Sequence, residues 1–410
     1  MNYNITFTQP HAVSVALPAS KSLSNRMLIL NALSGNAGQL SNIADCNDTN
    51  AMLNALANKG QHIDIGAAGT AMRFLTAYYA CQSGKDIVID GSERMRHRPI
   101  GVLVDALRQC GAEIDYAGEE GFPPLHIKGK ALNPPERLQI PANISSQYIS
   151  ALMMIVPVME SDMTIELTGE LVSRPYLEMT ASLMRTFGAT INFDGQLISI
   201  RKGNYRKTDC TVESDWSAAS YWYEMKALLP DCDIELLGLH RNSLQGDNAV
   251  AKYFESFGVI TEFTEKGVIL HSNPSAKAEK IAFNLSKQPD LAQTIVATSC
   301  LLGIPFRIEG LSTLKIKETD RIEALKTELH KLGYAVEGDN DSMQWNGERI
   351  AADQAIEIHT YDDHRMAMSL APAAILFPSM TVKDIEVVKK SYPDYWNHIS
   401  AIGFKLNETK

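Results

Sequence analysis

Residues 103–111, LVDALRQCG, form the end of a predicted helix that stops at a glycine, and this ending recurs along the chain. Apolar residues spaced near i, i+3, i+4 and i+7 indicate an amphipathic helix. Glycine is the residue that most easily takes the left-handed conformation just after a helix. A strand-like alternation follows, as in residues 112–116. The copies occupy residues 52–60, 103–111, 181–188, 250–258, 324–333 and 395–403.

These endings predict six internal repeats, which end near Gly60, Gly111, Gly188, Gly258, Gly333 and Gly403. Their spacing of about 70 residues is far too long for a solenoid and fits a unit of two helices and several strands. Helix–glycine–strand endings also occur in ordinary α/β proteins, so the endings alone leave that reading open. The first repeat is followed closely by Gly69, so we expect it to lack a strand pair that the other copies have.

Length and composition predict a two-domain α/β protein. A chain of 410 residues is too long for one ordinary core. Composition shifts near residues 17–20 and 212–216. If both shifts are crossings between the same two domains, one domain holds residues 1–18 plus 214–410 and the other holds 19–213.

Charge and hydropathy argue against several classes of protein. The formal net charge is −10, the opposite of what nucleic-acid binders usually carry. The most apolar stretch, residues 151–159, contains Pro157 and is far short of the about 20 residues that span a bilayer. No secretory signal precedes residue 20, and the six cysteines form no C-x-x-C pair. We therefore expect a cytoplasmic protein with reduced thiols.

Polar residues at predicted helix starts suggest anion binding. Ser20 or Ser22 can cap a helix that carries Lys21 and Arg26 in its first turns. The free N–H groups and the dipole at a helix start favour a bound anion. Gly69 and the residues after it repeat this arrangement, because glycine allows close approach of the backbone. A capped helix with solvated charges is the alternative at each place.

Three further segments also place polar or basic residues at or near predicted helix starts. An arginine-rich loop ends at Arg98, and Ser145, Ser146 and Gln147 open a very apolar helix. Ser173 opens the next helix. Simple capping and a solvated loop are the alternatives, whereas clustered arginines can also clamp carboxylates or phosphates.

The C-terminal half adds candidates for acid–base chemistry. Lys317 and Arg321 are predicted to share a helix face with Glu318 between them, where two cations can hold a carboxylate ionised beside a bound anion. Asp362 can cap a helix that begins with a His-Arg pair, and Asp290 lies just before another helix. If the basic residues converge, one site could hold several negative charges. They are Lys21, Arg26, Arg98, Lys317, Arg321, Arg365 and Lys390. No histidine pair has metal-ligand spacing, so no metal is expected.

Taken in order, these segments resemble the EPSP synthase (3-phosphoshikimate 1-carboxyvinyltransferase) family from about residue 3 to 400. The matching motifs are KSLSNR at 21–26, GTAMR at 69–73, RPI at 98–100, SSQ at 145–147, SRPY at 173–176, KETDR at 317–321 and DHRM at 363–366. The resemblance implies two similar domains, each of three βαβαββ repeats in an inside-out α/β barrel, with the active site in the interdomain cleft. It also implies transfer of the enolpyruvyl group of phosphoenolpyruvate to shikimate 3-phosphate, without a metal or organic cofactor.

The resemblance further implies a role for each matching residue. Those that would hold shikimate 3-phosphate are Ser22, Arg26, Ser145, Ser146, Gln147, Ser173 and Lys317. Those that would hold phosphoenolpyruvate are Gly69, Arg98, Arg321, Arg365 and Lys390. Lys21 would bridge both substrates. Asp290 would accept the proton of the 5-hydroxyl, and Glu318 would protonate the methylene carbon and later take a proton back. His364 would help to hold the leaving phosphate or Glu318.

The chain also departs from the family pattern. Ala67 replaces a usual Asn, Phe74 a usual Pro, and Thr313 an Asn that commonly contacts shikimate 3-phosphate. Two alternative functions remain at this stage. A UDP-N-acetylglucosamine enolpyruvyl transferase usually has a reactive cysteine near residues 94–98, where this chain has none. A non-catalytic sugar-phosphate binding protein would not need both Asp290 and Glu318. The resemblance implies small-molecule substrates, no nucleic-acid or membrane partner, and a monomer.

Overall fold

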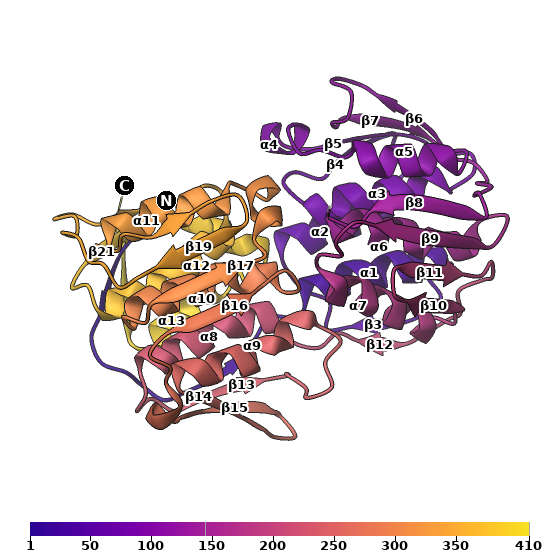
Figure 1. The fold of residues 1–410 in the computed structure, drawn as a ribbon. Helices are drawn as coiled ribbons and strands as arrows, with labels where there is room; N and C mark the ends of the chain where they lie inside the picture. The colour runs from indigo at the N-terminus through magenta and orange to yellow at the C-terminus, as the bar shows by residue number, and fades with distance from the viewer. Residues whose placement is uncertain (144, 410) are drawn as a thin grey trace. The chain divides into compact units, whose positions relative to one another are not determined.

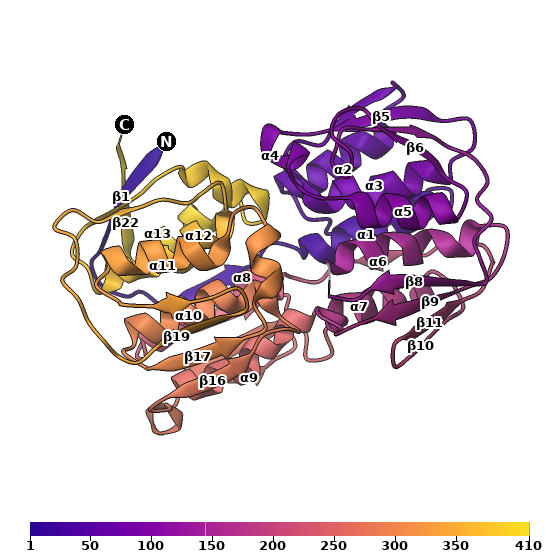
Figure 2. The same ribbon diagram turned by 45° about the horizontal axis from the view of Figure 1, so that its top comes forward.

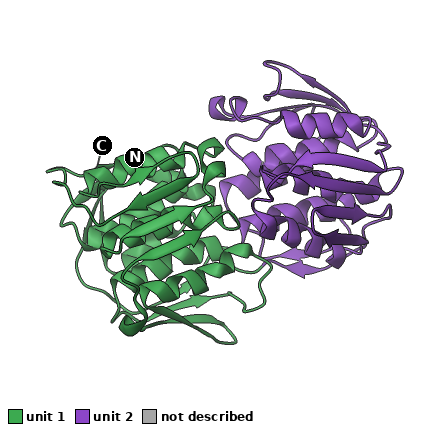
Figure 3. Ribbon diagram, in the orientation of Figure 1, with its two compact units in different colours: residues 1–18, 213–410 green, residues 19–212 purple. Residues whose placement is uncertain are grey.

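The computed structural model describes residues 1–143 and 145–409, and the chain divides into two compact units (Figure 3). Unit 1 holds residues 1–18 and 213–410, and unit 2 holds residues 19–212. Unit 2 is therefore inserted into unit 1. Across the described residues, every helix is too short or too polar to span a bilayer.

Unit 2 alternates helices with short strands (Figure 1). Its helices are α1 (Lys21–Leu33), α2 (Asn47–Ala57), α3 (Gly69–Ala80), α4 (Glu93–Arg96), α5 (Gly101–Gln109), α6 (Ser146–Ile155), η1 (Val156–Val158) and α7 (Arg174–Thr186). Its strands are β3 (Leu40–Ser41), β4 (His62–Asp64), β5 (Asp86–Asp90), β6 (Glu113–Tyr116), β7 (Leu125–Lys128), β8 (Arg137–Pro141), β9 (Met163–Thr168), β10 (Ile191–Asp194), β11 (Leu197–Ile200) and β12 (Cys210–Thr211).

Unit 1 has the same alternation, with its first two strands before the insertion. Its longer helices are α8 (Trp216–Leu228), α9 (Val250–Tyr253), α10 (Ala292–Leu301), α11 (Arg321–Lys331), α12 (His364–Leu370) and α13 (Tyr395–Ile402). Short 3-10 turns are η2 (Gly246–Ala249), η3 (Phe254–Phe257), η4 (Pro274–Ala276), η5 (Pro289–Leu291), η6 (Ser312–Ile316), η7 (Ala371–Ile375) and η8 (Ile385–Lys390). The strands are β1 (Asn2–Phe7), β2 (Val13–Ala16), β13 (Ile234–Leu237), β14 (Val259–Phe263), β15 (Gly267–Ser272), β16 (Ile281–Asn284), β17 (Phe306–Glu309), β18 (Glu337–Gly338), β19 (Ser342–Trp345), β20 (Glu357–Ile358), β21 (Met380–Val382) and β22 (Phe404–Thr409).

Within residues 1–143 and 145–409, the strands form five four-stranded sheets and one two-stranded sheet. Four of the larger sheets have the order first–second–fourth–third, as in β4-β5-β7-β6. In each, the first two strands are parallel and the repeat has the order βαβαββ. One helix joins the parallel strands in three of these sheets, whereas unit 2 is inserted between β2 and helix α8 in the fourth. The fifth sheet has the order β20-β21-β1-β22, and here the N-terminal strand β1 lies where the fourth strand of the repeat lies in the other sheets. The predicted α/β class is confirmed.

The two-stranded sheet of β12 and β3 belongs to the shortest repeat. These strands are parallel, like the first pair of every other sheet. The chain then passes from α2 almost directly to β4, so the hairpin that completes the other sheets is absent from this described stretch. The expected loss of a strand pair before Gly69 is therefore confirmed.

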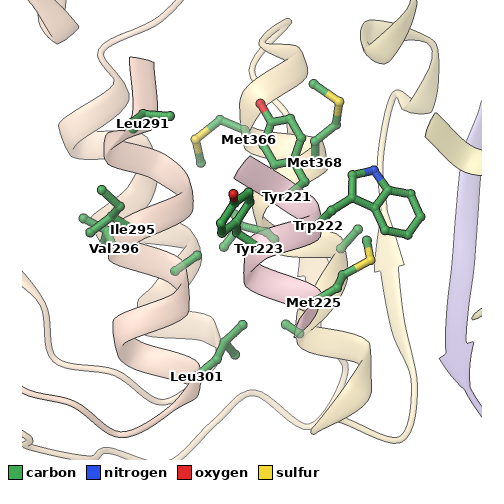
Figure 4. Packing of buried hydrophobic residues seen from close by; sticks show 14 of the residues in the cluster. Tyr221, Trp222, Tyr223, Met225, Leu291, Ile295, Val296, Leu301, Met366 and Met368 are labelled. Carbon is green, nitrogen blue, oxygen red and sulfur yellow. The ribbon is translucent and has the colours of Figure 1, made fainter. Parts of the chain in front are cut away.

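The first helix of each repeat lies in the core of its unit. In unit 1, α8, α10 and α12 pack against one another through residues such as Tyr221, Ile295 and Met366 (Figure 4). In unit 2, α1, α3 and α6 pack in the same way. Figure 2 shows α1, α3 and α6 within unit 2, and α3 packs against both of the other two helices. Each of these helices is apolar on most sides because it is surrounded by other helices, as expected for a core helix.

The glycine prediction is right at most helix ends and wrong at one. Gly111, Gly188, Gly258 and Gly333 have positive φ angles directly after a helical segment. Gly60 has no positive φ angle, because α2 already ends at Ala57 and the next residue, Asn58, has an extended backbone. The side chain of Asn58 accepts a hydrogen bond from the Gly60 amide instead. This helix therefore ends without a left-handed glycine.

Candidate active site

The repeat explains why the candidate residues of unit 1 converge. Each helix follows a strand, and the parallel strands of a repeat point the same way, so the helix starts lie at one end of the unit. Turns and helix starts at this end carry six of the predicted residues and bring them into one network. Ion pairs link these six residues, which are Asp290, Lys317, Glu318, Arg321, Arg365 and Lys390.

Arg321 lies at the centre of this network. Its guanidinium contacts Asp290 at 3.0 Å, Glu318 at 3.0 Å and Asp363 at 2.6 Å. Its side chain is 2% exposed. Although burial opposes the charge, Asp363 and the two other carboxylates raise the pKa of the Arg321 guanidinium above its usual value. Arg321 is therefore a fixed cation that holds three carboxylates in place.

Asp290 has three cations within reach. One carboxylate oxygen contacts Arg321 at 3.0 Å and Lys317 at 3.5 Å, and the other contacts Arg365 at 3.0 Å. Burial opposes ionisation of Asp290, but Arg365, Lys317 and Arg321 outweigh it and hold its pKa well below the usual range. The Asp290 carboxylate is therefore ionised, and it occupies a position where the cations could also meet a substrate anion.

Glu318 lies between two cations, but they are Arg321 and Lys390 and not the predicted pair of Lys317 and Arg321. One carboxylate oxygen contacts Arg321 at 3.0 Å, and the other contacts Lys390 at 3.0 Å. The side chain is 12% exposed, so part of it can reach a bound molecule. Lys390 at the end of η8 is thereby placed beside the same carboxylates as Arg321.

One expectation about this segment is wrong. Helix α11 begins at Arg321, with Asp320 as its cap, so Lys317 and Glu318 precede the helix and share no helix face with Arg321. They come together because η6 ends at Ile316 and an extended Lys317 follows it. The predicted cluster of charges still forms, because Lys317 and Arg321 contact Asp290 and Glu318 contacts Arg321.

Asp363, and not Asp362, caps α12. Its carboxylate accepts a hydrogen bond from the Arg365 amide at 2.9 Å and also binds Arg321. Asp362 has a left-handed backbone with φ 54, which moves the helix start on by one residue. His364 lies buried beside Asp363, with its Nδ1 atom 3.6 Å from the carboxylate. Arg365 bridges Asp290 and the hydroxyl of Tyr221, which is 3.4 Å away.

Unit 2 also gathers its candidates at helix starts. Ser20 caps α1, so Lys21 is the first helical residue and Ser22 the second, as predicted. The Lys21 ammonium contacts Asp48 at the start of α2, at 3.1 Å. Asp48 is therefore placed to orient Lys21.

Arg26 lies one turn further into α1 and is almost fully buried. It donates to the hydroxyl of Thr180 at 2.7 Å, to Ser150 at 3.2 Å and to the Ser22 carbonyl at 3.0 Å. Its guanidinium also lies over the ring of Phe74. Arg26 thus joins α1 to α6 and α7 and supports the backbone of Ser22.

Gly69, Arg98 and Gln147 form a second group in unit 2. A Cβ atom on Gly69 would meet the guanidinium of Arg98 at 2.6 Å, so the side chain of Arg98 lies directly against the start of α3. Gln147 donates to the hydroxyl of Thr70 at 3.2 Å and so connects α6 to the same helix start. Arg96 lies outside this group, because it pairs with Asp90 at 2.6 Å.

The serines before α6 and α7 have different roles. Ser145 caps α6 through the Gln147 amide, and Ser146 is the buried first residue of that helix. Ser173 precedes α7 with a left-handed φ of 55, and its side chain makes no cap hydrogen bond. Because non-glycine residues seldom adopt this conformation, Ser173 is strained in the way that residues at binding sites often are.

Sequence reasoning missed the carboxylates that hold the cations, above all Asp48 and Asp363. Both lie at the start of a helix, but only Asp363 is next in sequence to a predicted residue, His364, so only Asp363 had a local signal. Asp215 and Asp247 were missed as well, and Asp215 caps α8 through the amides of Ser217 and Ala218. Thr313 lies buried in η6, and its hydroxyl has no hydrogen-bond partner among the described residues.

Comparison with known proteins gives a consistent picture. The sequence pattern of the family described as EPSP synthase (3-phosphoshikimate 1-carboxyvinyltransferase) matches residues 6–64 and 56–399. A 3-phosphoshikimate 1-carboxyvinyltransferase of Bacteroides fragilis is 50% identical over 408 residues and covers 99% of both chains. One of Photorhabdus laumondii is 36% identical over 422 residues and covers 95% of this chain and 96% of its own.

A solved structure extends the likeness to the fold. The EPSP synthase of Acinetobacter baumannii superimposes with a TM-score of 0.76 at 20% sequence identity and covers 100% of both chains. At this identity the likeness supports the fold alone, whereas the family match and the full-length relatives support the assignment. The chain belongs to the EPSP synthase family.

Proposed function

We propose that this chain transfers the enolpyruvyl group of phosphoenolpyruvate to the 5-hydroxyl of shikimate 3-phosphate and releases phosphate. Family membership makes the chain a transferase of the shikimate pathway, which leads to the aromatic amino acids. The observation that carries the residue roles is the network around Arg321, where fixed cations surround two carboxylates. Both substrates carry a phosphate and a carboxylate, so fixed cations suit them.

We propose a division of roles by substrate. The residues that hold shikimate 3-phosphate are Ser22, Arg26, Ser145, Ser146, Gln147, Ser173 and Lys317. Those that hold phosphoenolpyruvate are Gly69, Arg98, Arg321, Arg365 and Lys390. The hydrogen bonds of Arg26 to Thr180 and Ser150 suggest that it acts mainly by fixing the Ser22 backbone.

The proposed chemistry uses Glu318 as acid and Asp290 as base. A protonated Glu318 gives its proton to the methylene carbon of phosphoenolpyruvate, and the adjacent carbon becomes electrophilic. The 5-hydroxyl oxygen then bonds to that carbon, and its proton passes to Asp290. In the second half the carbon–oxygen bond to phosphate breaks, the phosphate leaves with the proton that Asp290 had accepted, and Glu318 takes a proton back from the methyl group, so both carboxyl groups return to their starting states.

The cations stabilise the charges of this path. Arg321, Arg365 and Lys390 are already fixed by carboxylates, so little reorganisation is needed when the anionic adduct forms. Lys21, held by Asp48, bridges the two substrates, and His364 helps to hold the leaving phosphate. We also propose that the enzyme acts as a monomer in the cytoplasm.

Phosphate release tests this proposal. The chain is incubated with phosphoenolpyruvate and either shikimate 3-phosphate or UDP-N-acetylglucosamine, without added metal. Release with the first acceptor alone is expected. Release with the second alone would show that the acceptor is wrong, and release with neither would leave a binding protein.

A pair of variants tests the role of Asp290. Asp290→Asn removes the base but no cation, so we expect shikimate 3-phosphate binding to be kept and turnover to be lost by at least about a hundredfold. Asp353→Asn is the matched control, because Asp353 is an exposed aspartate of the same unit. Wild-type turnover in Asp290→Asn would exclude Asp290 as the base.

A further inference from the structure

A second buried carboxylate, that of Asp247, lies near Asp290. Asp247 belongs to η2 and is 3% exposed. Both η2 and η5, which carries Asp290, pack against α8. Tyr253, one helix turn after η2, donates a hydrogen bond to Gln288 at 3.1 Å, two residues before Asp290.

The Ser217 hydroxyl donates a hydrogen bond to Asp247. Tyr221, one turn further along α8, lies 3.4 Å from Arg365, which contacts Asp290. This chain of contacts places both carboxylates beside the first turns of α8, where their charges interact.

Asp290 needs such a neighbour if it is to accept a proton. Three cations contact its two oxygens, and each cation favours the ionised form. A carboxylate held so strongly in its ionised form is a weak base, and general-base catalysis weakens with the proton affinity of the base. Negative charge nearby restores part of that affinity, and Glu318, which shares the Arg321 guanidinium with Asp290, supplies some of it.

We infer that Asp247 is a positioning residue whose negative charge keeps Asp290 able to accept the substrate proton, an inference that rests on the proposed function. The proton moves from the 5-hydroxyl oxygen to an Asp290 oxygen, and Asp247 forms no bond in this step. When Asp290 becomes neutral, its repulsion of Asp247 ends, so protonation of Asp290 is favoured relative to a site without Asp247.

Some groups around Asp247 favour its charge and others oppose it. The Ser217 hydroxyl, in the first turn of α8, donates a hydrogen bond to its carboxylate. The other charged or titratable groups that face it are Asp215 before α8, Arg365 of α12 and Tyr253 of α9. Burial and the charge of Asp290 raise the pKa of Asp247 to about 6, and Arg365 and Ser217 oppose this rise. Asp247 is therefore ionised above about pH 7 and neutral in acid.

Kinetics with two variants test the inference. Asp247→Asn keeps an oxygen that can accept from Ser217 but removes the charge. We expect kcat to fall about three- to tenfold above about pH 7, with both KM values within about twofold of wild type, and this deficit to shrink below pH 6, where Asp247 of the wild type is already neutral. Ser217→Ala removes the hydrogen bond that favours the charged form, so its deficit should appear near pH 6.5 and close by pH 9. A purely structural role would not produce this recovery at high pH.

The double variant sharpens the result. If Ser217 acts through Asp247, Ser217→Ala adds nothing to Asp247→Asn, because the charge is already gone. Wild-type kcat in Asp247→Asn, a loss confined to KM, or additive losses in the double variant would overturn the inference. If Asp247→Asn fails to fold, the pH-dependent deficit of Ser217→Ala decides the matter alone.

A titration without substrate separates this inference from the proposed function. Interactions between two titrating groups are reciprocal, so Asp290 must raise the proton affinity of Asp247 if Asp247 raises that of Asp290. In protein with ¹³C-labelled aspartate carboxyls, the Asp247 signal, assigned by its absence in Asp247→Asn, should titrate near pH 6 and lower in Asp290→Asn. An unchanged midpoint overturns the coupling. If the wild type releases no phosphate but the titration midpoint of Asp247 is still lower in Asp290→Asn, the proposed function is rejected and the coupling of the two carboxylates is not.

Discussion

Gly69 and Arg98 are so close that a single added carbon would bring them into collision. A Cβ atom on Gly69 would lie 2.6 Å from one terminal nitrogen of Arg98 and 2.8 Å from the other. The atoms in the way are the far end of a flexible side chain, so the helix start of α3 can stay where it is. The space beside Gly69 therefore sets the position of a cation.

Gly69→Ala should move this cation without unfolding the protein. We expect the KM for phosphoenolpyruvate to rise by about tenfold, or about 1.4 kcal/mol, because the guanidinium is displaced from its binding position. The KM for shikimate 3-phosphate and the melting temperature should change little. Steady-state kinetics with each substrate varied in turn measure this. Gly203→Ala is the control, because Gly203 has no positive φ and open space around its Cβ position. Equal changes in both KM values would contradict the assignment of Arg98.

Arg321→Met should destabilise unit 1 strongly. The substitution leaves Asp290, Glu318 and Asp363 close together without their central cation. Breaking such a buried network costs about 3–5 kcal/mol. In the wild type, the lowered pKa of Asp290 gives stability that is present above the unfolded pKa and is lost as pH falls. The gap in melting temperature between variant and wild type should therefore be constant near neutral pH and narrow as pH falls below about 4, the unfolded pKa of an aspartate. If the gap in melting temperature does not change with pH, the loss of stability in Arg321→Met comes from lost packing and not from the lost charge.

Glu224→Gln should stabilise the protein at alkaline pH. Glu224 is fully buried in α8, and neither carboxyl oxygen has a hydrogen-bond partner among the described residues. Burial raises the pKa of this carboxyl well above its usual value. A raised carboxyl pKa means that the folded state binds the proton more tightly, so stability falls as pH rises above the unfolded value, by up to about 1.4 kcal/mol per pH unit.

Thermal unfolding from pH 5 to pH 9 measures this effect. The wild type should lose stability as pH rises, and Glu224→Gln should lose much less, because the amide does not titrate. Glu265→Gln is the control, since Glu265 is exposed in the same unit and should follow the wild type. Parallel curves for wild type and Glu224→Gln would show that Glu224 is not the titrating group.

Tyr361→Phe should loosen the turn that presents Arg365. The Tyr361 hydroxyl donates to the buried carboxylate of Glu328 at 2.6 Å, and Tyr361 and Asp362 both have left-handed backbones with φ near 55. Loss of this hydrogen bond removes about 1–2 kcal/mol from a turn that is already strained. We expect a lower melting temperature and a KM for phosphoenolpyruvate raised more than that for shikimate 3-phosphate. A drop in stability with both KM values unchanged would separate the turn from binding.

Local sequence signals predicted the elements that depend on neighbouring residues. The start of α1 was predicted with either Ser20 or Ser22 as its cap, and the structure shows that Ser20 is the cap. A serine just before a helix can accept hydrogen bonds from its first backbone amides, so this signal is local. The cap of α12 was misplaced by one residue. Two adjacent aspartates can both cap a helix, and the choice between Asp362 and Asp363 follows from the left-handed turn and from Arg321.

Contacts between distant residues could not be derived from periodicity or composition. Arg321 and Asp363 are in different repeats, and their pairing appears only when α11 and α12 pack in three dimensions. Lys21 and Asp48 lie on successive helices, and neither sequence segment indicates that the two residues form an ion pair. The family resemblance supplied the roles of the basic residues, but the carboxylates that hold them required the structure.

The division of unit 1 along the chain has a consequence for biosynthesis. β1 pairs with β21 and β22, and β2 pairs with β13, so the first two strands bind partners that the ribosome makes much later. Residues 19–212 form a continuous unit and can fold as they emerge. At a synthesis rate of about 5–20 residues per second, β1 waits on the order of 20–80 s for β22. During translation, β1 therefore stays unpaired and accessible to chaperones until β21 and β22 are made, whereas β2 waits only for β13.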